Sequence, residues 1–173
     1  MKVLVAVASR HGSTREIGDA VAEELRNSSI DAELRDVQDV NDLAGYDALL
    51  LGAAIYAGKW LPEASRFVEE CTEELAEMPI WLFSSGPLGH SPQPSDDLEK
   101  IAAPMSGPKT LGDKNFVGKL DPAGLGIAER LIVKVVGAPA GDFREWEEIR
   151  SWARNIATEL SALTPTPDVA VGQ

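Results

Sequence analysis

The segment KVLVAVASRHGSTR, residues 2–15, places an apolar strand, a hydroxyl-rich loop and a helix start next to one another. Lys2–Ala8 is an almost continuous apolar run without alternation, which is typical of a parallel strand buried on both faces. Ser9–Thr14 then supplies three hydroxyls and one glycine. A helix predicted from about Thr14 directs its free N–H groups and positive dipole end at this loop. This order predicts a site for a terminal phosphate group.

A structural cap is the alternative for the same loop. Ser13 and Glu16 have the spacing of a capping box, in which both side chains satisfy the helix end. The two interpretations are compatible if the hydroxyls are shared. Other phosphate motifs fit less well, because the chain has no Gly-Lys-Ser or Gly-Lys-Thr and Ser9–Thr14 lacks the glycines of a dinucleotide fingerprint. The loop therefore favours a phosphate monoester over a pyrophosphate.

Charge and composition limit the partners. The chain has 173 residues and a net charge of −12, with Asp and Glu outnumbering Lys and Arg 28 to 16, which argues against nucleic acid as a partner. The length predicts one domain at residues 1–163, followed by a patternless, mobile tail at 164–173. His11 and His90 are the only histidines and Cys71 is remote from both in sequence, so no metal site is predicted.

Cellular location follows from three sequence features. One cysteine excludes an internal disulfide, a core strand occupies the position where a signal peptide would lie, and no apolar run reaches the roughly eighteen residues of a membrane span. We expect a cytoplasmic protein without a transmembrane segment. A peripheral membrane contact stays compatible with this expectation.

Apolar runs and helical stripes alternate along the remaining chain. Further strands are predicted at 30–37, 47–54, 80–84 and 115–120, with a loop at 55–60 and a polar connection at 107–114. Predicted helices begin near Thr14, Pro62, Asp96, Gly124 and Asp142. The buried stripe of the second helix comprises Ala64, Phe67, Val68, Cys71 and Leu75, and that of the last helix Trp146, Ile149, Trp152, Ile156 and Leu160. The alternation predicts a doubly wound α/β sandwich, with a five-stranded parallel sheet and helices on both faces.

Three loops follow the carboxyl ends of predicted strands, where ligands bind in such sheets. They are Ser9–Thr14, Ala54–Trp60 and Ser84–Pro94. A phosphate loop beside two loops of small and aromatic residues predicts a site for a planar ring with a phosphate tail.

The motifs SRHGST, LGAAIYAGKW and FSSGPLG resemble the three FMN loops of the flavodoxin superfamily. GAAIYAG, together with KLDPAGLGIAERLIVKVVG and a last helix containing tryptophan, is most similar to its menaquinone-dependent protoporphyrinogen oxidase branch. The resemblance implies FMN, strand order 2-1-3-4-5 and redox chemistry carried by the flavin, without catalytic side chains. Tyr56 lies one position earlier than the branch's aromatic residue, the third loop is small and acidic, and the whole chain is acidic.

The resemblance also implies which residues would hold FMN. The phosphate would contact Ser9, Arg10, His11, Gly12, Ser13 and Thr14. One side of the ring would face Ala54, Ile55, Tyr56, Ala57, Gly58 and Trp60, and the other Ser85, Gly86, Pro87, Leu88 and Gly89. Tyr56 or Trp60 would stack on the ring, or both would merely cover the end of the sheet.

Two functions stay open at this point. The first is an FMN-dependent oxidoreductase that passes electrons between the flavin and a quinone-like or porphyrinogen-like acceptor. The second is an electron carrier that docks redox proteins through an acidic face. Gly124–Val136 distinguishes them, because a substrate or lipid could meet Arg130 and Lys134 on one helix face, whereas a carrier would use this segment for packing. A signalling receiver domain would need acidic residues after the first strand, and Ser9-Arg10-His11 supplies none.

Overall fold

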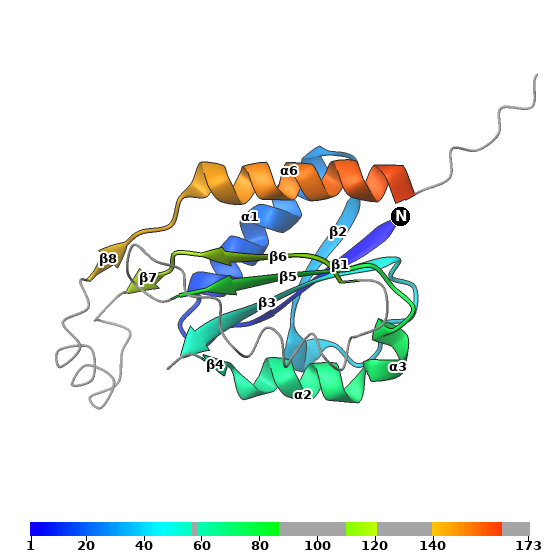
Figure 1. The fold of residues 1–173 in the computed structure, drawn as a ribbon, viewed down its shortest axis with the longest axis horizontal. Coiled ribbons are helices and arrows are strands. Elements are labelled where there is room, and N and C mark those ends of the chain that lie inside the picture. Colours follow the sequence, from blue (N-terminus) through cyan, green and yellow to red (C-terminus); the bar gives the residue numbers. More distant parts are fainter. Residues whose placement is uncertain (57–58, 87–109, 121–139, 164–173) are drawn as a thin grey trace, which may run out of the picture.

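The computed structural model describes residues 1–56, 59–86, 110–120 and 140–163. These residues form a main twisted sheet with helices on both faces, and a separate sheet of two short strands (Figure 1). The strands of the parallel sheet are β1 (Lys2–Ala8), β2 (Asp31–Asp36), β3 (Ala48–Tyr56), β5 (Ile80–Ser85) and β6 (Thr110–Phe116). The helices are α1 (Ser13–Asn27), α2 (Pro62–Glu70), α3 (Thr72–Leu75) and α6 (Trp146–Leu163), with a 3-10 turn η1 at Val37–Asp39.

The parallel strands lie in the order β2-β1-β3-β5-β6. This order equals the predicted 2-1-3-4-5 when the five parallel strands are numbered along the chain. The predicted fold class is therefore confirmed. The strands with continuous apolar runs, β1, β3 and β5, occupy the centre, where both faces of a strand are covered.

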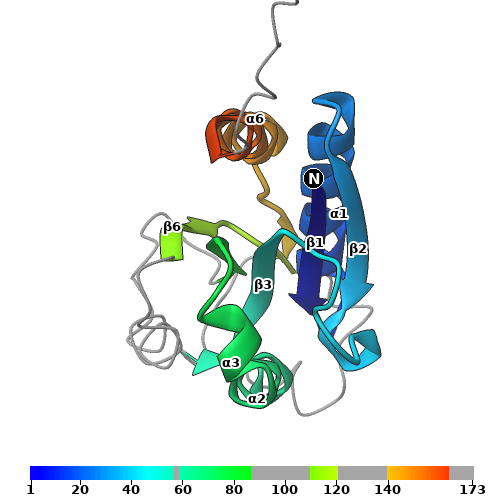
Figure 2. The same ribbon diagram turned by 90° about the vertical axis from the view of Figure 1, so that its right-hand side faces the viewer.

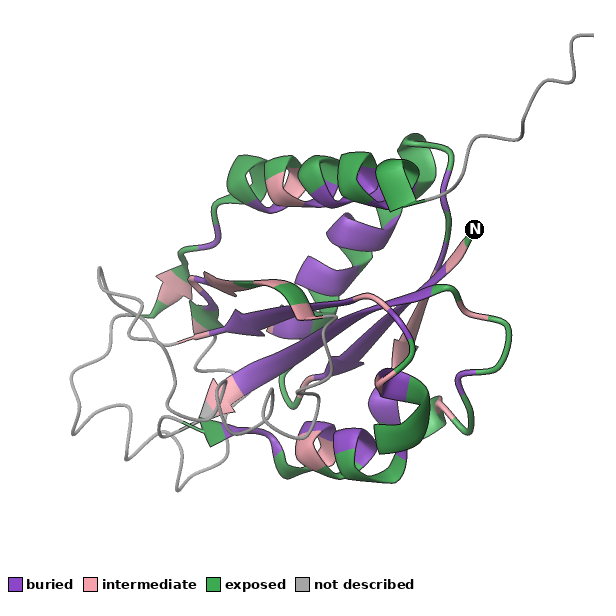
Figure 3. Ribbon diagram, turned by 45° about the vertical axis from the view of Figure 1, so that its right-hand side comes forward, coloured by how far each residue is buried: buried purple, intermediate pink, exposed green. Residues whose placement is uncertain are grey.

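Alternate residues of β1 divide the core into two layers. Leu4 and Ala6 pack with α2 and α3, whereas Val3, Val5 and Val7 pack with α1 and α6. Figures 2 and 3 show the two helical layers on opposite faces of the sheet and the buried residues between them. Burying each Val or Leu contributes about 1.5–3 kcal/mol relative to leaving it exposed, so β1 stabilises both layers.

A glycine makes room for the aromatic centre of the α1–α6 layer. Gly52 is the register partner of Phe83, and a Cβ atom on Gly52 would lie 2.1 Å from the Phe83 ring. The Phe83 ring contacts Trp152 edge-on at 5.8 Å, and Trp152 contacts Phe116 at 5.5 Å between ring centroids. The predicted aromatic contribution of Trp152 to the core is confirmed.

Two predicted connections are strands in the structure. Residues 107–114 were expected to form a polar connection, but β6 begins at Thr110 and ends at Phe116. It is an end strand of the parallel order, and only Phe116 among its residues is buried, so it lacks an apolar run. Residues 55–60 were expected to form a loop, but β3 continues to Tyr56 and Lys59–Trp60 pairs with it as β4.

The predicted strand at 115–120 is also wrong in its second half. Lys119–Leu120 forms β7, which pairs antiparallel with β8 at Gly141–Asp142 and not with the main sheet. This pairing joins residues about twenty positions apart, so no local pattern indicates it.

The helices predicted from Pro62 and from Asp142 differ from expectation. The helix from Pro62 breaks at Cys71, where φ is −107°, although all five residues of its predicted stripe are buried. The last helix begins at Trp146 instead of Asp142. Trp146 is 36% exposed and lies over Arg144, outside the packed stripe of Ile149 and its successors.

The predicted helices near 96–103 and 124–136 and the predicted tail at 164–173 lie outside the described residues. Among the helices that are described, none has the length and apolar character needed to cross a membrane. The described part of the chain contains no group of three or more His, Cys, Asp or Glu side chains arranged for a metal ion.

Candidate functional site

The three predicted ligand loops meet at the carboxyl edge of the sheet. Ser13 Oγ, after β1, lies 3.4 Å from Ser85 Oγ at the end of β5. The Gly86 N–H donates to the Phe116 carbonyl at 3.1 Å, and a Cβ atom on Gly86 would lie 3.2 Å from the carbonyl oxygen of Ile55. Gly86 has a φ of +125°, a conformation that favours glycine. The described ends of all three loops therefore border one another.

The start of α1 has no side-chain cap among the described residues. Gly12 is the N-cap, with a φ of +82°, and its carbonyl accepts the Glu16 N–H at 2.9 Å. Ser13 lies inside the helix, where its Oγ accepts the backbone N–H of Lys119 at 3.2 Å. The capping box considered from the sequence is therefore not formed. By helix geometry, the N–H groups of the first turn before Glu16 have no intrahelical acceptor.

Thr14 has the side chain that most directly indicates a missing ligand. It is fully buried, and its Oγ1 has no hydrogen-bond partner among the described residues. A buried hydroxyl without a partner costs about 1–3 kcal/mol, so native proteins seldom keep one without a reason. Thr14 belongs to the first turn of α1, where the helix dipole favours an anion. A phosphate oxygen would satisfy both the hydroxyl and the helix end.

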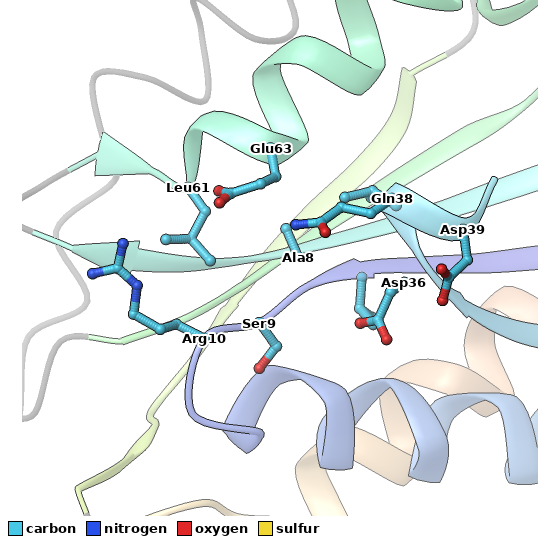
Figure 4. A pocket seen from close by; sticks show the side chains of 10 residues that line it. Ala8, Ser9, Arg10, Asp36, Gln38, Asp39, Leu61 and Glu63 are labelled. Atoms are coloured by element: carbon cyan, nitrogen blue, oxygen red, sulfur yellow. The ribbon is translucent and has the colours of Figure 1, made fainter. Parts of the chain in front are cut away.

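A cavity of about 330 Å³ lies on the other side of the first loop, between the ends of β1 and β2 and the start of α2. Figure 4 shows Asp36, Asp39 and Glu63 around it, with Arg10 at the opposite end from Asp39. Arg15 already pairs with Asp36. Three carboxylates would repel a phosphate dianion, so the charges that line this cavity do not suit a phosphate group.

Arg144 is the functional candidate that sequence reasoning missed. Its side chain is only 2% exposed and reaches from the segment after β8 to the first turn of α1. Its Nε and Nη2 donate to the two carboxylate oxygens of Asp142 at 2.8 and 2.6 Å, and its Nη1 lies 2.7 Å from Glu16 Oε2. The Trp146 ring covers the guanidinium, with 4.4 Å from Cζ to the ring centroid. No local pattern marks this arginine as a site residue, because Glu16, the partner that links it to the first loop, lies on α1 and is distant in sequence.

The charges around Arg144 reinforce one another. Burial by itself would lower the pKa of Arg144, but hydrogen bonds with Asp142 and Glu16 more than offset it, so the pKa is raised. The hydrogen bond from Arg144 also lowers the pKa of Asp142. Both groups are therefore fully charged near neutral pH, and the buried arginine is held in one place.

The other predicted site residues are distributed as follows. Arg10 and His11 are exposed, and Ser9 is partly buried at the mouth of the cavity. Ser85 and Ala54 are buried at the ends of their strands. Ala57, Gly58, Pro87, Leu88 and Gly89 lie outside the described residues, as does the side chain of Tyr56.

Trp60 occupies a position closer to the sheet-covering alternative than to ring stacking. It is 4% exposed and belongs to the apolar layer between the sheet and α2. Its Nε1 is buried and has no hydrogen-bond partner among the described residues. The indole N–H is therefore a donor without a described acceptor.

The family model of the flavodoxin domain matches residues 4–146. The chain belongs to the flavodoxin-domain family. Its fold agrees with this, because an archaeal flavodoxin superposes with a TM-score of 0.64 over 93% of this chain and 99% of that one, at 16% identity. The rubredoxin oxygen:oxidoreductase of Desulfovibrio gigas reaches 0.63 at 16% identity, over 93% of this flavodoxin domain and 36% of its own length.

A curated relative is similar over nearly its whole length. The protoporphyrinogen IX dehydrogenase [quinone] of Escherichia coli K12 is 25% identical over 175 residues, which span 91% of this chain and 95% of the relative. Flavodoxin domains hold FMN at the switch point between the first and third strands, so the predicted cofactor is confirmed at the level of the family. A flavodoxin-type redox function follows with it.

Proposed function

We propose that this flavodoxin domain binds FMN with its phosphate at Ser9–Thr14 and works as an oxidoreductase on a quinone-like or porphyrinogen-like small molecule. The observation that supports the phosphate position is the buried Oγ1 of Thr14 at the start of α1, which has no hydrogen-bond partner in the described part of the chain. FMN ends in a phosphate monoester, and the first turn of α1 offers hydroxyls and N–H groups to such a group.

The chain's own residues supply binding and orientation, while bound FMN supplies the electron-transfer chemistry. Ser9, Ser13 and Thr14 donate hydroxyls to the phosphate, and Arg10 and His11 border it. The ring lies between the second loop, from Ala54 to Trp60, and the third loop, from Ser85 to Gly89. Gly86, which has no side chain, lets the described ends of these loops approach closely, because a Cβ atom there would lie 3.2 Å from the Ile55 carbonyl oxygen. No acid, base or nucleophile of the protein is required in this scheme.

The acceptor class is supported by the similarity to the Escherichia coli protoporphyrinogen IX dehydrogenase [quinone], which extends over most of both chains. In such a reaction the porphyrinogen loses electrons and protons, and the quinone gains them and becomes a quinol. FMN held by the three loops would supply the electron transfer between the two molecules. A cytoplasmic enzyme that contacts the membrane at its periphery would meet both molecules.

An electron carrier is the second candidate, and the net charge of −12 favours it. Acidic surfaces steer a carrier toward cationic redox proteins and accelerate their encounter at low ionic strength. A carrier needs no substrate site, whereas the proposed enzyme does.

The test begins with the visible spectrum of the purified protein and chromatography of the released cofactor. We expect FMN; recovery of FAD, or failure of the apoprotein to take up FMN at micromolar concentration, would contradict the proposed site. The reduced protein is then mixed anaerobically with menadione or with oxidised cytochrome c. Rapid, salt-independent reoxidation by the quinone, together with flavin reduction by protoporphyrinogen IX, supports the oxidoreductase. Reoxidation by cytochrome c alone, slowed by salt, would support the carrier.

A further inference from the structure

The start of α1 contains an electrostatic conflict for any phosphate bound there. Glu16 lies in the first turn, two residues after Thr14. Its carboxylate stabilises the helix end by opposing the dipole, but it would repel a phosphate dianion at the same end. Without compensation, the protein would place like charges around one helix terminus.

Two cations from one distant part of the chain neutralise this carboxylate. Arg144 Nη1 lies 2.7 Å from Glu16 Oε2, and Lys119 Nζ lies 3.8 Å from Glu16 Oε1. Lys119 belongs to β7, and Arg144 lies two residues after the end of β8. The β7–β8 unit also contacts the first loop directly, because the backbone N–H of Lys119 donates to Ser13 Oγ. The Phe143 N–H donates to the Gly118 carbonyl at 3.3 Å, so the two flanks of this unit are joined.

Arg144 is the stronger of the two partners. Its side chain is 2% exposed, held by both oxygens of Asp142 and covered by Trp146, whereas the Lys119 side chain is 36% exposed. A charge shielded from water acts more strongly on its neighbours than an exposed one. The two hydrogen bonds to Asp142 also fix the guanidinium of Arg144, so this group does not move to contact the phosphate.

We infer that Arg144 is a positioning residue for the flavin phosphate: it neutralises and holds Glu16, and so allows the start of α1 to accept a dianion. This inference rests on the proposed function, because it assumes that FMN places its phosphate at this helix end. Arg144 acts through Glu16 and does not contact the cofactor. The β7–β8 unit thereby contributes to cofactor affinity from outside the three flavin loops.

The experiment measures the Kd of apoprotein for FMN and for riboflavin by quenching of flavin fluorescence. Arg144→Gln should weaken FMN binding about tenfold or more and leave riboflavin binding within about twofold, since riboflavin has no phosphate. Glu16→Gln in the same chain should restore most of the FMN affinity, because the unpaired carboxylate is then absent. Glu16→Gln alone should change FMN affinity little. Arg144→Lys keeps the positive charge and should retain most of the FMN affinity.

Lys119→Gln is the variant that stays informative if Arg144→Gln does not fold, because Lys119 is half-exposed and leaves no buried charge behind. It should weaken FMN binding by a smaller factor of about two to five, again reversed by Glu16→Gln.

Equal losses for FMN and riboflavin, or no recovery with Glu16→Gln, would overturn the inference and leave Arg144 as a purely structural link. Wild-type protein that binds riboflavin and FMN equally well, or neither, would instead overturn the proposed phosphate site. The two failures are distinguished by the wild-type measurement alone.

Discussion

Replacing Thr14 by Val should move stability and cofactor affinity in opposite directions. Valine keeps nearly the shape of threonine and removes the hydroxyl, which is fully buried and has no partner among the described residues. The apoprotein should gain stability, because an unsatisfied buried hydroxyl costs about 1–3 kcal/mol. At about 2–4 °C per kcal/mol for a chain of this size, the apoprotein Tm should rise by a few degrees.

The FMN complex should lose affinity for the same reason. A hydrogen bond to a charged group contributes about 1.5–3 kcal/mol, which corresponds to roughly a ten- to hundredfold weaker Kd for FMN. Riboflavin lacks the phosphate and should bind the Thr14→Val variant about as well as wild type. Thermal denaturation with and without each flavin measures both effects on one sample. The stabilisation by saturating FMN should therefore shrink in the variant, although its apoprotein unfolds later.

Thr110→Val is the matched control. Thr110 Oγ1 is also buried and unpartnered among the described residues, but it lies at the first residue of β6, at the opposite end of the sheet from the loops. The control should raise the apoprotein Tm and leave both flavin affinities unchanged. If Thr14→Val weakens FMN and riboflavin equally, or lowers the apoprotein Tm, the phosphate does not contact Thr14 and the reasoning from the orphan hydroxyl is refuted.

Two further predictions concern stability. A hydrogen bond from Tyr46, followed by bonds from cationic neighbours, lowers the pKa of Glu33 from 4.5 to about 2, so its stabilising contribution is complete above about pH 4.5 and is lost as the pH falls toward 2. Urea unfolding at pH 7 and pH 2 should show Glu33→Gln less stable than wild type at pH 7 and equal to it at pH 2; a difference independent of pH would contradict this. Gly52→Ala should destabilise the fold by about 1–3 kcal/mol or more, because its Cβ would lie 2.1 Å from the Phe83 ring, whereas Gly112→Ala, with its nearest contact at 3.5 Å, should be tolerated in the same assay.

Local patterns were sufficient for the centre of this fold. The strands β1, β3 and β5 are buried on both faces, so nearly every residue in them is apolar and the runs are visible in the sequence. The stripe of α1, with Ile17, Val21 and Leu25, is visible because one side of that helix is buried. The first loop was predicted as a phosphate site because its hydroxyls and glycine lie together between such a strand and such a helix.

The margins of the fold depended on partners that are distant in sequence. β6 is the last strand of the parallel order and pairs with β5. Most of its residues are polar, so no apolar run predicted a strand there. The strand predicted at 115–120 includes β7, but its pairing with the distant two-residue strand β8 has no local signal in the sequence.

The sequence by itself determined the doubly wound class and the first helix, because burial on both faces or along one stripe leaves a periodic trace. Only the tertiary structure decided that Thr14 Oγ1 has no hydrogen-bond partner among the described residues and that Arg144 pairs with Glu16. Arg144 and Glu16 are 128 positions apart in the chain, and the surroundings of Thr14 depend on how separate elements pack. Local periodicity carries no information on such long-range contacts.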